Sequence, residues 1–165
     1  MDKHKPSRRL SIALLSGLIL ILAACTTPDS QASQAIAKGE THAAAGEYTA
    51  AETAFRQAAQ QQPDSPIPAL HLAQLYADWG RPQSGLAALQ QAQQRGASEQ
   101  EIYPLNLQLL AQAGKWGEVI QQTQTYLTNY PDDTHSHPLL VQAYLQQREC
   151  QRAAEIAARN KPPHY

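Results

Sequence analysis

The sequence predicts an all-α protein built as a solenoid of repeated helical hairpins. Gly46, Gly80 and Gly114 stand 34 residues apart twice over, and other residue types recur in step with them. A fixed period of about 34 residues is typical of stacked helix-turn-helix units, each unable to bury its apolar face alone. The chain is also rich in Ala and Gln and almost free of two-residue alternation, which favours helix throughout. We therefore expect about four helical hairpins and no strand.

The register of the repeats can be tested at other positions. With each glycine at place 15, the units are expected at residues 32–65, 66–99, 100–133 and 134–161. Place 20 requires a small residue where two helices cross, and it holds Ala51, Gly85, Val119 and Ala153. Place 11 requires a large residue, and it holds His42, Tyr76, Leu110 and Tyr144. Three of the four residues fit at each place, and over further places the fit decays toward the C-terminus.

Breaks in the helical pattern fall where one unit should end and the next begin. Prolines follow the first unit, Gly96 to Ser98 follow the second, and 131–134 follow the third. Ser98 and Glu101 have the spacing of a capping box, in which each residue satisfies a backbone N–H of the other. We expect the first helix of the third unit to begin at Ser98.

The first unit carries a recognisable pattern, namely Gly39, Gly46, Tyr48, Ala51, Phe55, Ala58 and Pro63. These residues resemble the tetratricopeptide repeat (TPR), and the resemblance covers roughly residues 32–161. It implies a right-handed superhelical solenoid with a folded domain at 34–161 and a tail at 162–165.

The fourth unit is expected to be degenerate. Arg148 occupies the place of the turn glycine, so we expect a different turn between its two helices. Cys150 stands at place 17, where the family packs a large residue between helices. We therefore expect a partly buried, inert thiol, in preference to a redox-active one.

The N-terminal segment has the outline of a secretory signal at residues 1–24. Four basic residues precede an apolar run from Leu10 to Ala24, and no charge follows until Asp29. The run has 15 residues, whereas a helix that crosses a bilayer needs about 20. A cleaved signal is therefore favoured over a permanent transmembrane helix.

The signal ends in Leu22-Ala23-Ala24-Cys25, which resembles the bacterial lipobox. The resemblance implies cleavage before Cys25 and lipidation of that residue, so acyl chains would hold the protein at a membrane surface. Thr26 after the cysteine resembles lipoproteins destined for the outer membrane; in a Gram-positive host the anchor would be the outer face of the cell membrane. Residues 25–33 are expected to be the lipidated cysteine and a short polar tether.

Charge argues against nucleic acid as a partner. Removal of residues 1–24 leaves 13 acidic and 9 basic residues, a formal net charge of −4. The basic residues form no patch in the sequence, and nucleic-acid-binding domains normally present one.

The sequence contains no recognisable catalytic constellation. His135-Ser136-His137 is the best candidate for a metal or hydrolase site, but no Cys or acidic residue stands at metal-ligand spacing from it. No phosphate-binding glycine loop or nucleophile elbow is present. We expect a protein that is not an enzyme and that carries no metal and no cofactor.

The resemblance implies that the first helix of each repeat lines a peptide-binding groove. Place 9 holds Glu40, Gln74, Gln108 and Gln142, and an amide can pair with an extended peptide backbone. Leu70, with Ala77 and Ala111 at place 12, would provide an apolar strip and room for a ligand. The basic clamp that some relatives use for a C-terminal carboxylate is absent, because places 2 and 6 hold Ile67, Glu101, His71 and Leu105 in the middle repeats. An internal peptide segment or a partner's helix is therefore expected.

These features favour a membrane-anchored scaffold in the bacterial cell envelope, similar to TPR lipoproteins of pilus biogenesis. An adaptor for peptidoglycan enzymes or for outer-membrane protein assembly is the alternative, and a hydrolase or metal-binding protein using His135 and His137 is the third possibility. Ile156 and its neighbours in the last repeat are expected to be uncovered, which makes this end a candidate for self-association.

Overall fold

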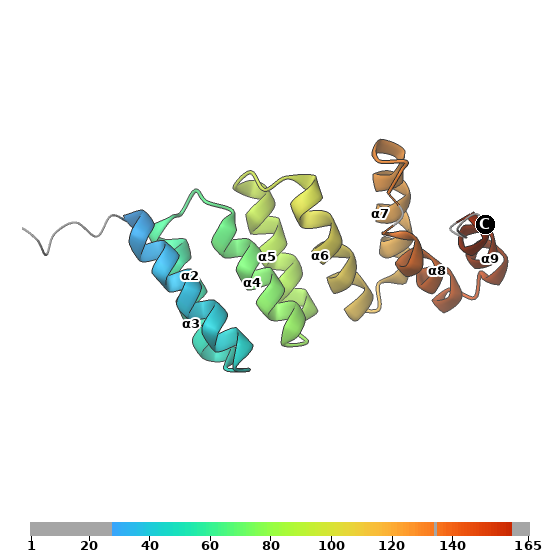
Figure 1. Cartoon of the computed structure of the whole chain (residues 1–165). Helices are drawn as coiled ribbons and strands as arrows, with labels where there is room; N and C mark the ends of the chain where they lie inside the picture. Colours follow the sequence, from blue (N-terminus) through green and yellow to red (C-terminus); the bar gives the residue numbers. More distant parts are fainter. Residues whose placement is uncertain (1–27, 134, 160–165) are drawn as a thin grey trace, which may run out of the picture.

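The computed structural model describes residues 28–133 and 135–159, and this part of the chain is entirely helical between its turns. In this part of the chain, eight helices form four hairpins that follow one another in a row from α2 to α9 (Figure 1). The helices are α2 (Pro28–Ala44), α3 (Tyr48–Gln61), α4 (Ile67–Asp78), α5 (Pro82–Gln94), α6 (Glu99–Gln112), α7 (Trp116–Asn129), α8 (His137–Gln146) and α9 (Cys150–Arg159). No strand occurs in the described residues, so the predicted all-α fold class is confirmed.

The turns inside the four hairpins share one geometry. The residue at the turn has a positive φ in every case, and these residues are Gly46, Gly80, Gly114 and Arg148, with φ of 75°, 68°, 71° and 61°. In each turn the residue after the one with positive φ donates its N–H to the carbonyl five residues before it. Arg81, for example, donates to the carbonyl of Tyr76 at 2.8 Å. This is the Schellman arrangement, for which glycine is the preferred residue because it has no Cβ.

The expectation of a different turn in the fourth repeat is therefore wrong. Arg148 adopts the left-handed conformation of the glycines, and the N–H of Glu149 donates to the carbonyl of Tyr144 at 2.8 Å. The hairpin of α8 and α9 therefore keeps the turn geometry of the other three, with Arg148 in a backbone conformation that is unfavourable for a residue with a Cβ.

The first helix begins earlier than the expected domain start at residue 34. α2 begins at Pro28, and its first turns already pack, since Ala32 is fully buried and Ser33 Oγ donates to the carbonyl of Asp29 at 2.8 Å. Residues 28–33 therefore belong to the folded domain and not to an extended tether. Residues 1–27, which include the expected signal and Cys25, lie outside the described residues.

The start of α6 is a capping box, as predicted. Ser98 Oγ accepts from the N–H of Glu101 at 3.3 Å, and the Glu101 carboxylate accepts from the N–H of Ser98 at 2.8 Å. α6 then continues through Pro104, which lacks an N–H for the helical ladder.

Small residues allow the closest helix crossings. Gly39 in α2 faces Phe55 in α3, and Gly85 in α5 faces Leu109 in α6. Each glycine lies so close to its neighbour that a Cβ at either position would overlap the facing side chain. Leu75, Leu109 and other buried residues then form a core that runs along the row of hairpins.

Candidate functional site: a groove between α4 and α6

The structure forms a cavity of about 400 Å³ between the first helices of the second and third repeats. Its lining is symmetrical, because the same four places of the repeat contribute from each helix. These residues are Ile67, Leu70, His71 and Gln74 from α4, and Glu101, Pro104, Leu105 and Gln108 from α6. α4 and α6 pack directly against each other, so the cavity is a shallow groove over their contact.

The floor of this groove is apolar and only partly covered. Ile67 is 50% exposed, Leu70 and Leu105 are half-buried, and Pro104 is exposed. An exposed isoleucine beside other apolar side chains favours a binding partner that covers it, because removal of apolar surface from water is favourable.

The two glutamines at the polar edge of the groove differ in their hydrogen bonding. Gln74 Nε2 donates to Asp78 Oδ1 at 2.9 Å, within the same helix. Gln108 is exposed, and its side chain has no hydrogen-bond partner among the described residues. A ligand backbone at this edge would meet a free amide on α6 and an amide with a free oxygen on α4.

His71 is the one titratable ring in the groove lining. Its ring stacks on Phe55 with centroids 5.2 Å apart, and its Nδ1 lies 3.8 Å from Glu40 Oε1. Burial lowers the pKa of His71 because it disfavours the charged ring, and the nearby Glu40 carboxylate offsets this only in part. The groove therefore presents a neutral imidazole near pH 7.

Glu101 supplies a negative charge at the other end of the groove. Hydrogen bonds from the Ser98 hydroxyl and then from the Ser98 backbone N–H hold the pKa of Glu101 below its usual value. The carboxylate is therefore ionised at neutral pH while it also caps α6.

The predicted groove residues divide into two sets. Leu70, Gln74 and Gln108 lie together in the lining. Glu40 on α2 reaches His71 but does not line the cavity, and Gln142 is exposed on α8 and also lies outside it.

Ala77 and Ala111 were expected to provide an apolar strip with room for a ligand, and the structure places both outside the cavity. Ala77 is 3% exposed and belongs to the core, and Gln112 Nε2 donates to its carbonyl at 3.2 Å. Ala111 is half-buried and packs on the core of the third repeat. Neither alanine lines the cavity.

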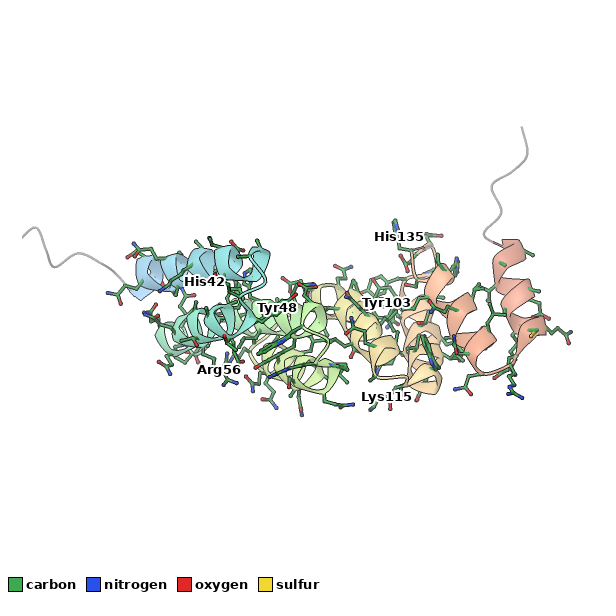
Figure 2. All side chains as sticks on the ribbon, turned by 90° about the horizontal axis from the view of Figure 1, so that it is seen from below. His42, Tyr48, Arg56, Tyr103, Lys115 and His135 are labelled. Atoms are coloured by element: carbon green, nitrogen blue, oxygen red, sulfur yellow. The ribbon has the colours of Figure 1, made fainter. Side chains whose placement is uncertain are left out.

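The His135-Ser136-His137 segment is held in the fold by its central serine. Ser136 is buried, Tyr103 Oη donates to its Oγ at 3.0 Å, and its own hydroxyl donates to Asp133. His135 points outward from the turn before α8 (Figure 2). Within residues 28–133 and 135–159, no group of three His, Cys, Asp or Glu side chains is arranged to hold a metal ion.

Cys150 differs from its prediction. The thiol is exposed at the first residue of α9, whereas a partly buried one was expected. The equivalent Tyr48 is covered because it stacks on Trp79 of the next repeat, with centroids 5.5 Å apart. No helix follows α9 in the described part of the chain to cover Cys150 in the same way.

The sequence did not predict a second cavity, which lies between α5, α6 and α7. It has a volume of about 740 Å³ and is formed by α5, α6 and α7. A signal was present in the sequence, since Leu107 and Val119 are bulky where the first two repeats carry small residues. Tyr103 of α6, labelled in Figure 2, is one of the residues that line this cavity.

Comparison with protein families agrees with the geometry. The tetratricopeptide repeat family model matches residues 33–75, which cover most of α2, all of α3 and most of α4. A search of curated proteins found no match. None of the described helices is long and apolar enough to cross a membrane.

TPR repeats generally bind protein partners, and folds of this type are typically non-catalytic scaffolds. The 34-residue period, the four hairpins with a common turn, and the family match at residues 33–75 lead to one conclusion. The described residues form an all-helical row of four hairpins that is consistent with a solenoid of the tetratricopeptide repeat type, and residues 33–75 match the family model.

Proposed function

We propose that this protein is a membrane-anchored scaffold that holds a protein partner in the groove between α4 and α6, in the bacterial cell envelope. The observation that carries the proposal is the paired lining of the groove, in which equivalent residues of two repeats surround an exposed apolar floor. Pocket-sized apolar surfaces with a few polar groups are typical of binding sites.

The groove favours an extended or helical peptide over a small charged ligand. The apolar side chains of Ile67, Leu70 and Leu105 offer a surface for two or three apolar side chains of the partner. Gln108 can pair with a backbone amide, and the lining contains no Lys or Arg that could hold a carboxylate. An internal segment of a partner therefore fits better than a free C-terminus.

The membrane anchor is supported by the sequence alone. The basic and apolar start of the chain and the lipobox-like Leu22 to Cys25 favour lipidation of Cys25. Since α2 begins at Pro28, two residues separate Cys25 from the helix, and the groove would stay close to the bilayer. A scaffold at this place suits assembly of a surface machine such as a pilus or secretion system.

The anchor is tested by replacing Cys25 with Ser in a Gram-negative host supplied with an alkyne-labelled fatty acid. The wild-type chain should incorporate the label and sediment with outer-membrane vesicles. Cys25→Ser should lose both properties, while Cys150→Ser, the matched control, should keep them. A wild-type chain without label would overturn the anchor and leave the groove proposal standing.

The groove is tested by photocrosslinking in intact cells. A photoreactive amino acid at Gln74 or Gln108 should give one adduct of the same mass. At Gln57 and Gln91, exposed residues of α3 and α5, this adduct should be missing. With the partner then purified, Gln74→Ala combined with Leu70→Ala should weaken binding about tenfold or more. Unchanged affinity would show that the partner does not use the groove.

A further inference from the structure

The third repeat has a wider helix crossing than its neighbours. Its two crossing places hold Leu107 and Val119, which are 3% and 0% exposed. The equivalent pairs are Gly39 with Ala51, Ala73 with Gly85, and Val141 with Ala153. The distance between packed helices depends on the side chains at their contact, so two bulky residues hold α6 and α7 apart.

The consequence is visible in the packing of α7. α6 and α7 approach each other less closely than the two helices of any other hairpin. Figure 1 shows α7 turned away from α6, whereas α4 and α5 run side by side. The cavity of about 740 Å³ opens where α7 diverges, with walls on α5 and α7 and a floor on α6.

Two contacts fix the position of α6 relative to α7 at this cleft. Tyr103 of α6 stacks on Tyr126 of α7 with ring centroids 3.5 Å apart, and Asn106 Nδ2 donates to Gln122 Oε1 at 3.2 Å. Both contacts join the floor to the α7 wall. The cleft is therefore pre-organised, and a ligand would not have to order it on binding.

The lining of this cavity contains several side-chain amides and two acidic side chains. Gln90 and Gln93 on α5 and Gln121 on α7 are exposed and have no side-chain hydrogen bond among the described residues. Glu99 and Glu118 are the charged residues of the lining, which holds no Lys or Arg. Lys115 pairs with Glu118 at 2.9 Å, but both side chains are exposed, and such a pair exchanges readily.

We propose that this cleft, which we name the α5–α7 cleft, is a second binding site for an extended peptide segment that carries lysine or arginine. The amides of the two walls match the donors and acceptors of a peptide backbone. Leu86, Leu89 and Ile102 accept an apolar side chain, and Glu99 and Glu118 accept a flanking cation. The cleft uses α5, α7 and residues of α6 that do not line the groove between α4 and α6, and the two linings share no residue, so the protein can hold two segments at once.

The test uses a defined peptide and the full-length chain purified in detergent. The probe is the fluorescently labelled peptide Gly-Ser-Leu-Lys-Thr-Leu-Lys-Ser-Gly, acetylated and amidated, and its counterpart has glutamate at both lysines. Fluorescence anisotropy should show saturable binding of the lysine peptide that weakens as salt is added, and no binding of the glutamate peptide. Binding of neither peptide, or equal binding of both, would overturn the proposal.

Variants locate the binding. Glu99→Lys with Glu118→Lys should reduce affinity for the lysine peptide at least about tenfold. Asp64→Lys with Glu155→Lys makes the same change in net charge at exposed residues outside the cleft and should leave the affinity within about twofold. An equal loss of affinity in the two double variants would show that net charge alone determines binding, and it would refute the site.

Two further variants separate this site from folding defects and from the proposed groove. Gln93→Lys with Gln121→Lys changes only exposed wall residues, leaves the N-terminus of α6 intact, and should also abolish binding. Gln74→Ala with Gln108→Ala alters the groove between α4 and α6 and should have no effect on the lysine peptide. If the groove variant alone removes binding, the peptide occupies the groove and the α5–α7 cleft is not the site.

Discussion

The ring of Phe55 lies directly against the Cα of Gly39, so close that a Cβ added to Gly39 would be 2.4 Å from Phe55 Cε1. Both residues are buried at the crossing of α2 and α3. Hydrogen is therefore the largest side chain that this crossing accepts, and the glycine is required by contact with Phe55, not by backbone conformation.

Replacement of Gly39 by Ala should destabilise the first hairpin. The methyl group must push Phe55 aside, and such overpacking costs about 1–3 kcal/mol. Urea denaturation followed by far-UV circular dichroism measures the change. Gly117→Ala in α7 is the matched control, because a Cβ there meets only Gln147 Nε2 at 3.9 Å and alanine favours helix by about 0.5–1 kcal/mol. Equal effects of the two substitutions would contradict the steric argument.

Replacement of Arg148 by Gly should stabilise the protein. Arg148 has a φ of 61°, which costs a non-glycine residue about 1 kcal/mol or more. Thermal unfolding should show a higher midpoint for Arg148→Gly. Gly80→Ala, which places a side chain in the equivalent turn, should lower the midpoint. A lower midpoint for Arg148→Gly would mean that the arginine side chain makes contacts worth more than its backbone strain.

The groove histidine predicts a pH dependence of stability. Burial lowers the pKa of His71 in the folded protein below the ordinary histidine value of about 6.5, so the unfolded chain binds more protons as pH falls through that value. The contribution of His71 is complete above pH 6.5 and decreases as pH falls toward the folded pKa. Denaturation at pH about 7.5 and about 5.5 should show a larger loss of stability in wild type than in His71→Phe. The phenylalanine keeps the stacking on Phe55 and removes the titration; an identical loss in both proteins would exclude His71 as the cause.

The exposed thiol of Cys150 should react freely in the folded protein. In a Cys25→Ala chain, which leaves one cysteine, Ellman's reagent should label Cys150 without denaturant at a rate within about tenfold of that of free cysteine. Burial would instead require unfolding before reaction. A thiol that reacts only after urea is added would restore the original expectation of a covered side chain.

Local sequence signals were sufficient for most of the fold, because the residues that terminate helices act on their own neighbours. Gly80 ends α4 and the Ser98 and Glu101 pair begins α6 through contacts within six residues. Arg148 misled the prediction because the missing glycine was expected to change the turn, whereas the arginine backbone adopts the same positive φ as the glycines.

The sites were harder to predict because they depend on spacing between helices. The repeat register brought Gln74 and Gln108 into one lining, but it could not show that Ala77 is covered by the core. Cys150 was misjudged because its cover would come from a following helix, as Trp79 covers Tyr48. The α5–α7 cleft depends on two buried residues, Leu107 and Val119, whose effect appears only when the helices are packed.

Each hairpin in this row rests on its immediate neighbours, so the array should fray from its ends inward and not unfold at once. The last hairpin has a small core around Leu140, Tyr144 and Ala153, against which Ile120 and Leu127 of α7 also pack, and Ile156 is half-buried there. Leu145, on the same hairpin, is 52% exposed. Local unfolding of α9 would therefore leave the contact between α4 and α6 intact, and the groove would keep its shape while the C-terminal hairpin opens and closes.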